Sequence, residues 1–142
     1  MELDDLYQEV LLDHYRHPRG AAPVSDRELV MEEVNPACGD HLRLAFELRD
    51  GHVVQVRHES RGCAISIASA SIMAAFVEGR TPAEIRAAAD GVIAMMRGES
   101  DLPADGPEDL AALAGVRQFP MRIKCATMCW HAMKAALDRQ DA

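Results

Sequence analysis

Along the first third of the chain, the apolar residues change from helical spacing to spacing suited to a strand. Residues 2–17 are predicted to form an amphipathic helix that Pro18 ends, and one face carries Leu3, Leu6, Tyr7, Val10, Leu11 and His14. Residues 29–34 are apolar and β-branched enough for a strand, which the Asn35–Pro36 pair terminates. The pattern therefore predicts one amphipathic helix followed by the first strand of a sheet.

Residues 41–60 alternate between apolar and polar side chains, as the two strands of a β-hairpin do. The Asp50–Gly51 pair suggests a two-residue turn, but that register would place Gln55 on the leucine face. We therefore expect a three-residue loop over residues 49–51, with Gly51 in the left-handed position of a bulge. The expected pairs are Leu48–His52, Phe46–Val54 and Leu44–Val56.

Beyond the hairpin the spacing is helical. Residues 64–76 are dense in Ala, Ser and Ile, whose small members let a helix pack closely on a sheet. Thr81 and Glu84 form a capping-box pattern with Pro82 at the first helical position, and the helix they start should run to about Arg97. Further on we expect an acidic loop at 98–107, a short helix at 108–114 and a last helix at 121–139. Strands followed by helices indicate an α+β domain, with helices covering one face of a small antiparallel sheet.

Length and composition indicate one ordinary globular domain. The 142 residues (15.6 kDa) are 49% apolar and 27% charged, as in folded proteins. A net charge of −8 repels phosphate backbones, and one Trp, two Tyr and three Phe are too few for base stacking, so nucleic-acid binding is not expected. The longest uncharged apolar stretch, residues 63–77, is too short for a membrane span. The acidic N-terminus lacks a signal core, which predicts a cytoplasmic protein.

Charge is unevenly distributed along the chain. Residues 99–109 carry five acidic side chains and no basic one, whereas residues 116–142 carry five basic and two acidic ones. One interpretation is a solvent-facing loop and a helix with i,i+4 ion pairs. The alternative is that the basic segment faces an acidic surface on a partner protein, and the sequence leaves both open.

Three of the four cysteines lie where a thiolate is favoured. Cys38 lies in a turn between two predicted strands, with the carboxylate of Asp40 two residues on. Cys63 opens a helix, where unpaired amides and the helix dipole favour the thiolate, and Cys125 follows a short basic segment. In a reducing compartment such cysteines are more typical of metal ligands or nucleophiles than of disulfides. Three thiolates and one carboxylate form a legitimate tetrahedral zinc set, although scattered cysteines are also typical of small buried hydrophobes.

Other candidate ligands have ordinary structural interpretations. Cys129 follows Cys125 by four residues and could pair with it on a metal, but a small buried thiol fits better. His14 and His17 are spaced for one helix face, where packing is more ordinary than metal binding. His41 directly follows Asp40 and could orient that carboxylate if Asp40 is a metal ligand. The histidines expected on the surface are His52, His58 and His131.

Three motif blocks of the chain resemble those of the U-type iron–sulfur cluster assembly proteins. The blocks are NPACGD, RGCAISIASAS and FPMRIKCATMCWHAMKAAL, in the family's order and with its strand–hairpin–helix context between them. The opening LYQEVLLDHYRHPRG is similar to the family's first helix, so the resemblance covers nearly the whole chain. It implies a single domain over residues 1–142, with a small three-stranded antiparallel sheet covered by helices.

Two features resemble the SufU branch of this family rather than the IscU-like scaffold branch. Lys124 stands where the scaffolds have a metal-binding histidine, and an extra segment at about 94–115 lies between the second and third cysteines. The resemblance then implies a zinc-dependent sulfurtransferase that accepts persulfide sulfur from a SufS-type cysteine desulfurase and stimulates that enzyme. The sulfur would pass to cluster assembly, with a scaffold of SufB/C/D type as a candidate recipient.

The same resemblance implies roles for particular residues. The zinc ligands would be Cys38, Asp40, Cys63 and Cys125. Cys38 would accept the sulfur when the desulfurase captures the metal with a histidine of its own, and Arg122 would help docking or exchange. Two alternatives stay open: an IscU-like scaffold that assembles a transient iron–sulfur cluster on the same cysteines, and a structural zinc domain that acts as an adaptor.

Overall fold

The centre of the fold is a three-stranded antiparallel sheet in the order β1–β2–β3, seen in a computed structural model that describes residues 3–100 and 108–140. The strands are β1 (Met31–Asn35), β2 (Asp40–Arg49) and β3 (His52–Arg61). The helices are α1 (Leu3–Arg16), α2 (Ala64–Val77), α3 (Pro82–Met96), α4 (Ala111–Ala114) and α5 (Pro120–Gln140). Short 3₁₀ turns, η1 (Glu108–Leu110) and η2 (Gly115–Gln118), flank α4.

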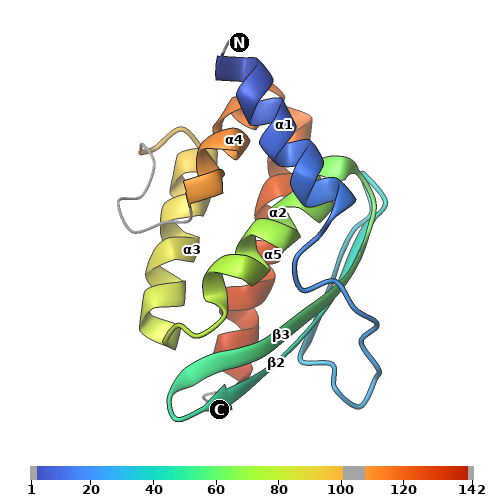
Figure 1. Ribbon diagram of the computed structural model, residues 1–142, viewed down its shortest axis with the longest axis vertical. Helices are drawn as coiled ribbons and strands as arrows, with labels where there is room; N and C mark the ends of the chain where they lie inside the picture. The colour runs from blue at the N-terminus through green and yellow to red at the C-terminus, as the bar shows by residue number, and fades with distance from the viewer. Residues whose placement is uncertain (1–2, 101–107, 141–142) are drawn as a thin grey trace.

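The helices form two layers against the sheet. Helices α2 and α5 cross each other and lie against the strands, while α1 packs on α2 and α3 packs on α5 (Figure 1). The expected α+β architecture, with an antiparallel sheet covered by helices, is confirmed. The expected helices at 64–76 and from Thr81 onward are also confirmed, the second with its capping box intact.

The turn of the β2–β3 hairpin has two residues, so the expected three-residue loop is wrong. Asp50 and Gly51 both have positive φ, 53° and 78°, as the central residues of a tight hairpin turn require. The strands start to pair as Arg49–His52, Leu48–Val53 and Glu47–Val54. The expected pairs Leu48–His52, Phe46–Val54 and Leu44–Val56 therefore do not form.

A β-bulge further along β3 restores the burial of the valines. Between the pairs Glu47–Val54 and Ala45–Arg57, two residues of β3, Gln55 and Val56, stand opposite one residue of β2. Gln55 adopts φ 55°, and Val53 and Val56 are consequently both buried. The Glu78 carboxylate accepts the N–H groups of Gln55 (3.0 Å) and Val56 (3.3 Å), which satisfies the two amides that the bulge frees.

Small residues on α2 allow α5 to approach it closely. Ser69 is fully buried, donates its hydroxyl to the carbonyl of Ala126 (2.6 Å) and accepts the indole N–H of Trp130 (3.3 Å). Trp130 is itself fully buried and lies with its ring centroid 6.4 Å from that of Phe76. Since Cys125 is also on α5, this packing fixes its position relative to the start of α2.

A polar network connects turn η1, which follows residues 101–107, to the helices of the core. His14 is 3% exposed, and its Nδ1 lies 2.7 Å from Ser71 Oγ while its Nε2 contacts the Asp109 carboxylate. Ser71 Oγ also accepts the N–H of Arg19 (2.8 Å), and the imidazole Nε2 donates to the Asp109 carboxylate. Helices α1 and α2 and turn η1 are thereby joined.

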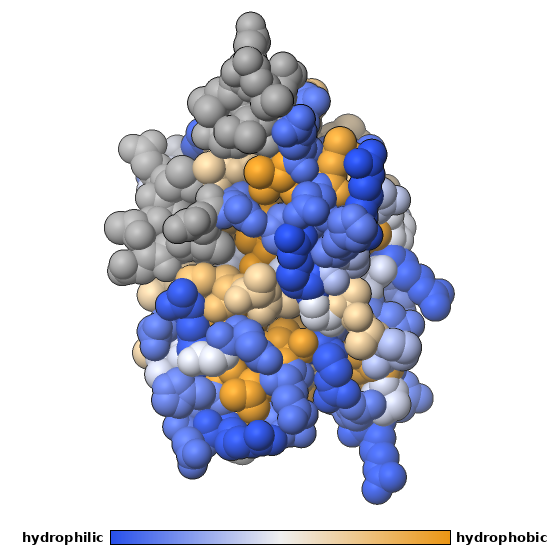
Figure 2. All heavy atoms as spheres, in the orientation of Figure 1, coloured by the Kyte–Doolittle hydropathy of each residue, from blue (hydrophilic) through white to orange (hydrophobic). Residues whose placement is uncertain are grey.

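The remaining predictions concern the loop and the helices of the C-terminal third of the chain. The short helix expected at 108–114 is η1 followed by α4, and the last helix begins at Pro120. Most of the acidic loop expected at 98–107 lies outside the described residues. In the described part of the chain no helix combines the length and apolar character needed to cross a bilayer. The face in Figure 2 is mainly hydrophilic, with hydrophobic residues in separate spots among charged ones.

Candidate metal and thiol site

Three separate elements bring the candidate ligands to one end of the sheet. The β1–β2 turn carries Cys38, whose N–H donates to the carbonyl of Asn35 (3.2 Å), and Asp40 is the first residue of β2. Cys63 is the N-cap residue of α2, and Cys125 lies in the second turn of α5. Because α2 and α5 pack together below this end of the sheet, their first turns meet the β1–β2 turn.

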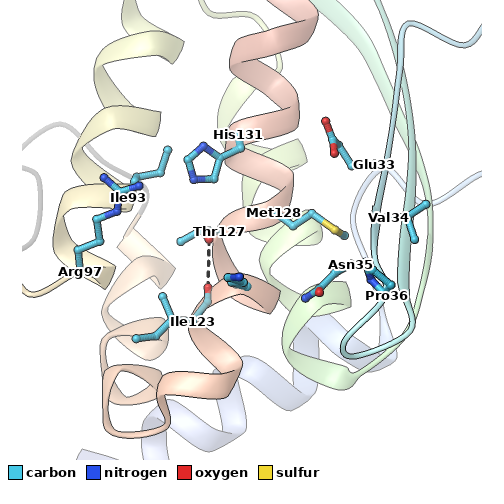
Figure 3. Close-up of a pocket in the computed structure, with 11 residues that line it drawn as sticks. Glu33, Val34, Asn35, Pro36, Ile93, Arg97, Ile123, Thr127, Met128 and His131 are labelled. Atoms are coloured by element: carbon cyan, nitrogen blue, oxygen red, sulfur yellow. Dashed lines mark hydrogen bonds between the residues drawn. The ribbon is translucent and has the colours of Figure 1, made fainter.

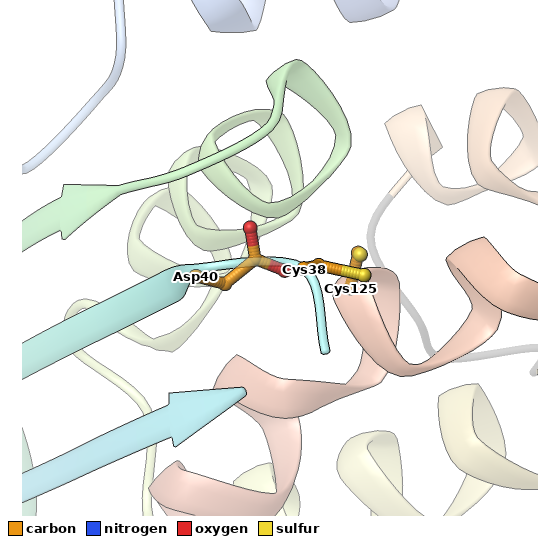
Figure 4. A group of neighbouring side chains, drawn as sticks. All are labelled: Cys38, Asp40 and Cys125. Atoms are coloured by element: carbon orange, nitrogen blue, oxygen red, sulfur yellow. The ribbon is translucent and has the colours of Figure 1, made fainter. Parts of the chain in front are cut away.

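The thiols of Cys38 and Cys125 and one carboxylate oxygen of Asp40 lie within 4.8 Å of one another (Figure 4). Cys63 stands beside this group: its N–H donates to Asp40 Oδ1 (3.0 Å), and its thiol is close enough to influence the pKa of both Asp40 and Cys125. Three of the four expected ligands are therefore grouped, and the fourth adjoins them.

Asp40 is an ionised carboxylate in a fully buried position. Burial alone would raise its pKa, but the Cys125 thiol, the Cys63 N–H and the Ser66 hydroxyl outweigh burial and hold the pKa below its ordinary value. Among the described residues, Oδ2 has no partner with hydrogen-bond geometry. A buried oxygen left unpaired costs about 1–3 kcal/mol, so this site favours a ligand of positive charge.

The neighbouring thiols differ in their tendency to ionise. Burial raises the pKa of Cys125, and the nearby Asp40, Cys38 and Cys63 raise it further. Burial acts in the same direction on Cys63, but hydrogen bonds from Ser66 outweigh it and lower the pKa of that thiol. In the absence of a cation the cluster therefore resists a second thiolate, because negative charges repel one another at this distance.

Arg122, to which the family resemblance gave a role in docking or exchange, lies beside the cluster. Its guanidinium is exposed, and hydrogen bonding to Cys125 with attraction to Cys63, Cys125 and Cys38 raises its pKa. It supplies one positive charge at the solvent edge of a site that otherwise gathers acidic groups.

The donor set fits Zn²⁺. Three thiols and one carboxylate are ligands that tetrahedral zinc sites use, and a cation would both satisfy Asp40 Oδ2 and stabilise more than one thiolate. The residues present are therefore suited to a metal ion.

Comparison with known proteins agrees with this arrangement. The family model of the NifU-like N terminal domain matches residues 6–139. The chain belongs to this family. Its relatives include the zinc-dependent sulfurtransferase SufU of Bacillus subtilis, 37% identical over 140 residues that cover 98% of this chain and 94% of the relative.

Proteins named for other functions are also similar to this NifU-like domain. The iron–sulfur cluster assembly scaffold protein IscU of Streptococcus pyogenes is 34% identical, over 97% of this chain and 86% of its own. The crystal structure of a nitrogen-fixing NifU-like protein from Brucella abortus superimposes with a TM-score of 0.87 at 25% identity, over 98% of this chain and 96% of that one. The fold is thus shared between relatives named for different roles.

Gly62 is a site residue of this NifU-like domain that sequence reasoning missed. It has φ +134°, and a Cβ there would overlap Asp40 Oδ1 and lie 2.8 Å from Asp40 Cα. Only glycine lets the end of β3 close over the Asp40 carboxylate before α2 begins. The sequence feature that could have identified Gly62 is its position directly before Cys63, a candidate ligand.

Cys129 does not belong to the cluster. It is 2% exposed on the core side of α5, with Sγ 3.4 Å from Ser69 Oγ. Burial raises its pKa to about 12, so the thiol stays neutral. The prediction of a small buried thiol is confirmed.

The histidines of the NifU-like domain do not join the cluster either. His14 contacts the Ser71 hydroxyl and the Asp109 carboxylate. A serine, a histidine and an aspartate are thus in contact, but Ser71 is fully buried, so no substrate can reach its hydroxyl. His41 hydrogen-bonds Glu32 (2.8 Å). His58, expected on the surface, is 1% exposed, because it bonds Ser60 and the carbonyl of Arg19.

Proposed function

We propose that this NifU-like domain is a zinc-dependent sulfurtransferase in iron–sulfur cluster assembly. It would accept sulfur from the persulfide of a SufS-type cysteine desulfurase, stimulate that enzyme, and deliver the sulfur to a cluster scaffold. The observation that carries the proposal is the grouping of Cys38, Asp40 and Cys125 with Cys63 beside them. The similarity to Bacillus subtilis SufU supports it, and the four free thiols suit a cytoplasmic, reducing setting.

Cys38, Asp40, Cys63 and Cys125 would hold the metal in this proposal. Bound Zn²⁺ would stabilise thiolates at neutral pH and, having no redox chemistry, protect them from oxidation. The chain itself places the ligands: Asp40 is fixed by the N–H of Cys63, and Cys125 is fixed by the packing of α5 on α2.

Cys38 is the proposed sulfur acceptor because it is the most loosely held cysteine of the cluster. It lies half-buried on a turn, whereas Cys125 is 1% exposed and Cys63, also half-buried, is the N-cap residue of α2. Its thiolate attacks the outer sulfur of the donor persulfide. A new S–S bond forms on Cys38, the donor S–S bond breaks, and the desulfurase cysteine leaves as a thiolate, so no oxidant or reductant is needed.

Arg122 is the proposed docking residue. Its exposed guanidinium faces the cluster and can attract the negative charge of an incoming persulfide. The assignment to the SufU branch rests on Lys124 before the third cysteine and on the segment at about 94–115, which we propose is an insertion relative to the scaffolds.

The deciding experiment combines metal analysis with an activity measurement. The protein is purified without added metal, zinc and iron are quantified, and sulfide release by a SufS-type desulfurase is measured with and without it. We expect about one zinc per chain and strong stimulation, lost in Cys38→Ser and kept in Cys129→Ala. Bound iron and sulfide without stimulation would indicate a scaffold instead. Zinc whose removal only unfolds the protein, with no effect on a desulfurase, would indicate an adaptor.

A further inference from the structure

A groove separate from the thiol cluster runs between β1, α3 and α5. Its volume is about 530 Å³, within the size range of ligand sites. Figure 3 shows Ile93 of α3 and the C-cap residue Arg97 on one side, Glu33 to Pro36 on the other, and Thr127 and His131 of α5 between them. We name it the β1–α3–α5 groove. The thiol of Cys38 does not line it.

The polar groups of the groove are mainly hydrogen-bond donors. Neither Arg97 nor Lys124, both exposed, forms an ion pair with another residue in the described ranges 3–100 and 108–140. Asn35 Nδ2 is buried and has no acceptor among the described residues. Glu33 is the one acidic residue in the lining. A ligand rich in acceptor oxygens would therefore supply the partners that the exposed Arg97 and Lys124 lack.

Burial and the positive charges of Arg97 and Lys134 lower the pKa of His131, while Glu33 opposes them. The imidazole is thus neutral at pH 7, and the positive charge of the groove comes from Arg97 and Lys124. That local charge is opposite in sign to the net charge of −8 on the whole chain.

The floor of the groove is apolar. Ile123 and Met128 are half-buried members of α5 that pack against the core, and Ile93 lies 6% exposed at the α3 wall. Val34 on β1 is 58% exposed at the rim. An occupant that fits both features therefore carries an apolar side chain as well as carboxylates, as an acidic peptide segment does.

The groove shares its walls with the turn that carries the proposed sulfur acceptor. Asn35, whose side chain lines the groove, also accepts the N–H of Cys38 through its carbonyl (3.2 Å). Lys124 in the groove directly precedes Cys125. A protein segment lying in the groove would therefore approach the thiol site from one side and leave its solvent edge, at Arg122, open.

We propose that the β1–α3–α5 groove binds an acidic segment of a partner protein, with carboxylates at Arg97 and Lys124 and an apolar side chain on Ile93, Ile123 and Met128. Charge complementarity selects this occupant over a neutral apolar peptide or a basic one. The proposal goes beyond sulfur transfer and assigns the protein a second contact surface.

The test is a titration of ¹⁵N-labelled, zinc-loaded full-length protein with the peptide acetyl-Asp-Leu-Glu-Leu-Asp-amide, followed by NMR. We expect amide shifts on β1, at the end of α3 and on α5 around Thr127, and weaker binding as salt rises. The neutral peptide acetyl-Asn-Leu-Gln-Leu-Asn-amide and free succinate should produce little shift. Equal binding of the neutral peptide, equal binding of succinate, or shifts confined to the thiol cluster would each overturn the proposal.

Matched charge variants separate local from long-range attraction. Arg97→Glu should weaken binding of the acidic peptide about five- to tenfold. Arg27→Glu makes the same change of charge at an exposed residue outside the groove and should leave binding within twofold. If both variants weaken binding equally, only the overall charge matters and the groove is not the site. No sulfur is transferred in this test, so its failure does not bear on the proposed sulfurtransferase activity.

Discussion

A methyl group on Gly62 would lie in the space that the Asp40 carboxylate occupies. The Cβ of an alanine there would stand 2.8 Å from Asp40 Cα and 2.9 Å from its Cγ, and would overlap Oδ1. The atoms in the way belong partly to the backbone of β2, so a rotamer change of Asp40 cannot relieve the contact. Gly62→Ala therefore disturbs the proposed metal site without removing any of its proposed ligands.

The expected loss of stability has two parts. The backbone at φ +134° is a region that alanine almost never adopts, which costs about 1–3 kcal/mol. Displacing Asp40 breaks its hydrogen bond with the Cys63 N–H and leaves buried polar groups unpaired, which costs about 1–3 kcal/mol more. Together about 2–6 kcal/mol would be lost, a large share of the 5–15 kcal/mol typical of a domain.

Gly51→Ala is the matched control, because Gly51 also has positive φ (+78°) but nothing lies within 4 Å of its added Cβ. This variant should lose about 1–2 kcal/mol through backbone strain alone. Urea unfolding with and without zinc, together with zinc content, distinguishes the two. Zinc should stabilise wild type and Gly51→Ala by the same amount and Gly62→Ala by less than half of it. If Gly62→Ala keeps full zinc content and the same stabilisation, the inferred role of Asp40 is wrong.

Three further predictions concern residues outside the proposed metal site. Glu78→Gln should lower the free energy of unfolding by about 1–2 kcal/mol in urea, since a neutral amide binds the bulge N–H groups less strongly than a carboxylate; an unchanged midpoint would contradict this role. Asp109→Asn should speed amide hydrogen exchange in η1 and α4 while zinc content stays unchanged, and unaltered exchange would show that the contact with His14 does not hold this segment. Burial lowers the pKa of folded His58, so the unfolded chain takes up the proton first as pH falls below about 6.5. Stability should therefore drop by at most about 1.4 kcal/mol per pH unit below that point, and the drop should be smaller in His58→Gln; an equal drop would refute the assignment.

The parts of the fold that the sequence predicted well are those with local causes. The helix from Pro82 begins at a capping box whose members all lie within four residues. The hairpin turn was mispredicted because its register depends on a bulge at Gln55, which the Glu78 carboxylate supports from 23 residues away. The burial of His58 likewise depends on the Arg19 carbonyl, 39 residues earlier. The hydrophobic periodicity of the sequence cannot predict either contact, because both join residues that are far apart in the chain.

The candidate site was predictable in its chemistry but not in its geometry. The positions of Cys38 in a turn and of Cys63 at the start of a helix predicted that both thiols ionise readily. Their separation along the chain does not predict which thiols lie together in the fold. The resemblance to a family supplied that grouping, and the structure brings Cys38, Asp40 and Cys125 within 4.8 Å. Gly62 escaped notice because its necessity appears only when the Asp40 carboxylate is seen against it.

The distribution of the proposed ligands over three elements would determine which of them can leave a bound metal at least cost to the fold. Asp40 is buried at the start of β2 and bonded to the Cys63 N–H, so its departure would also disturb the start of α2. Cys63 is the N-cap residue of α2 and donates its N–H to Asp40, so its departure would disturb both. Cys125 is enclosed where α5 packs on α2, and its departure would open the core. Cys38 is held by one backbone hydrogen bond to Asn35 and a long contact from Sγ to the Met121 carbonyl (3.8 Å). Its turn can therefore move while the rest of the cluster stays assembled, which is the property that a sulfur acceptor within a metal site requires.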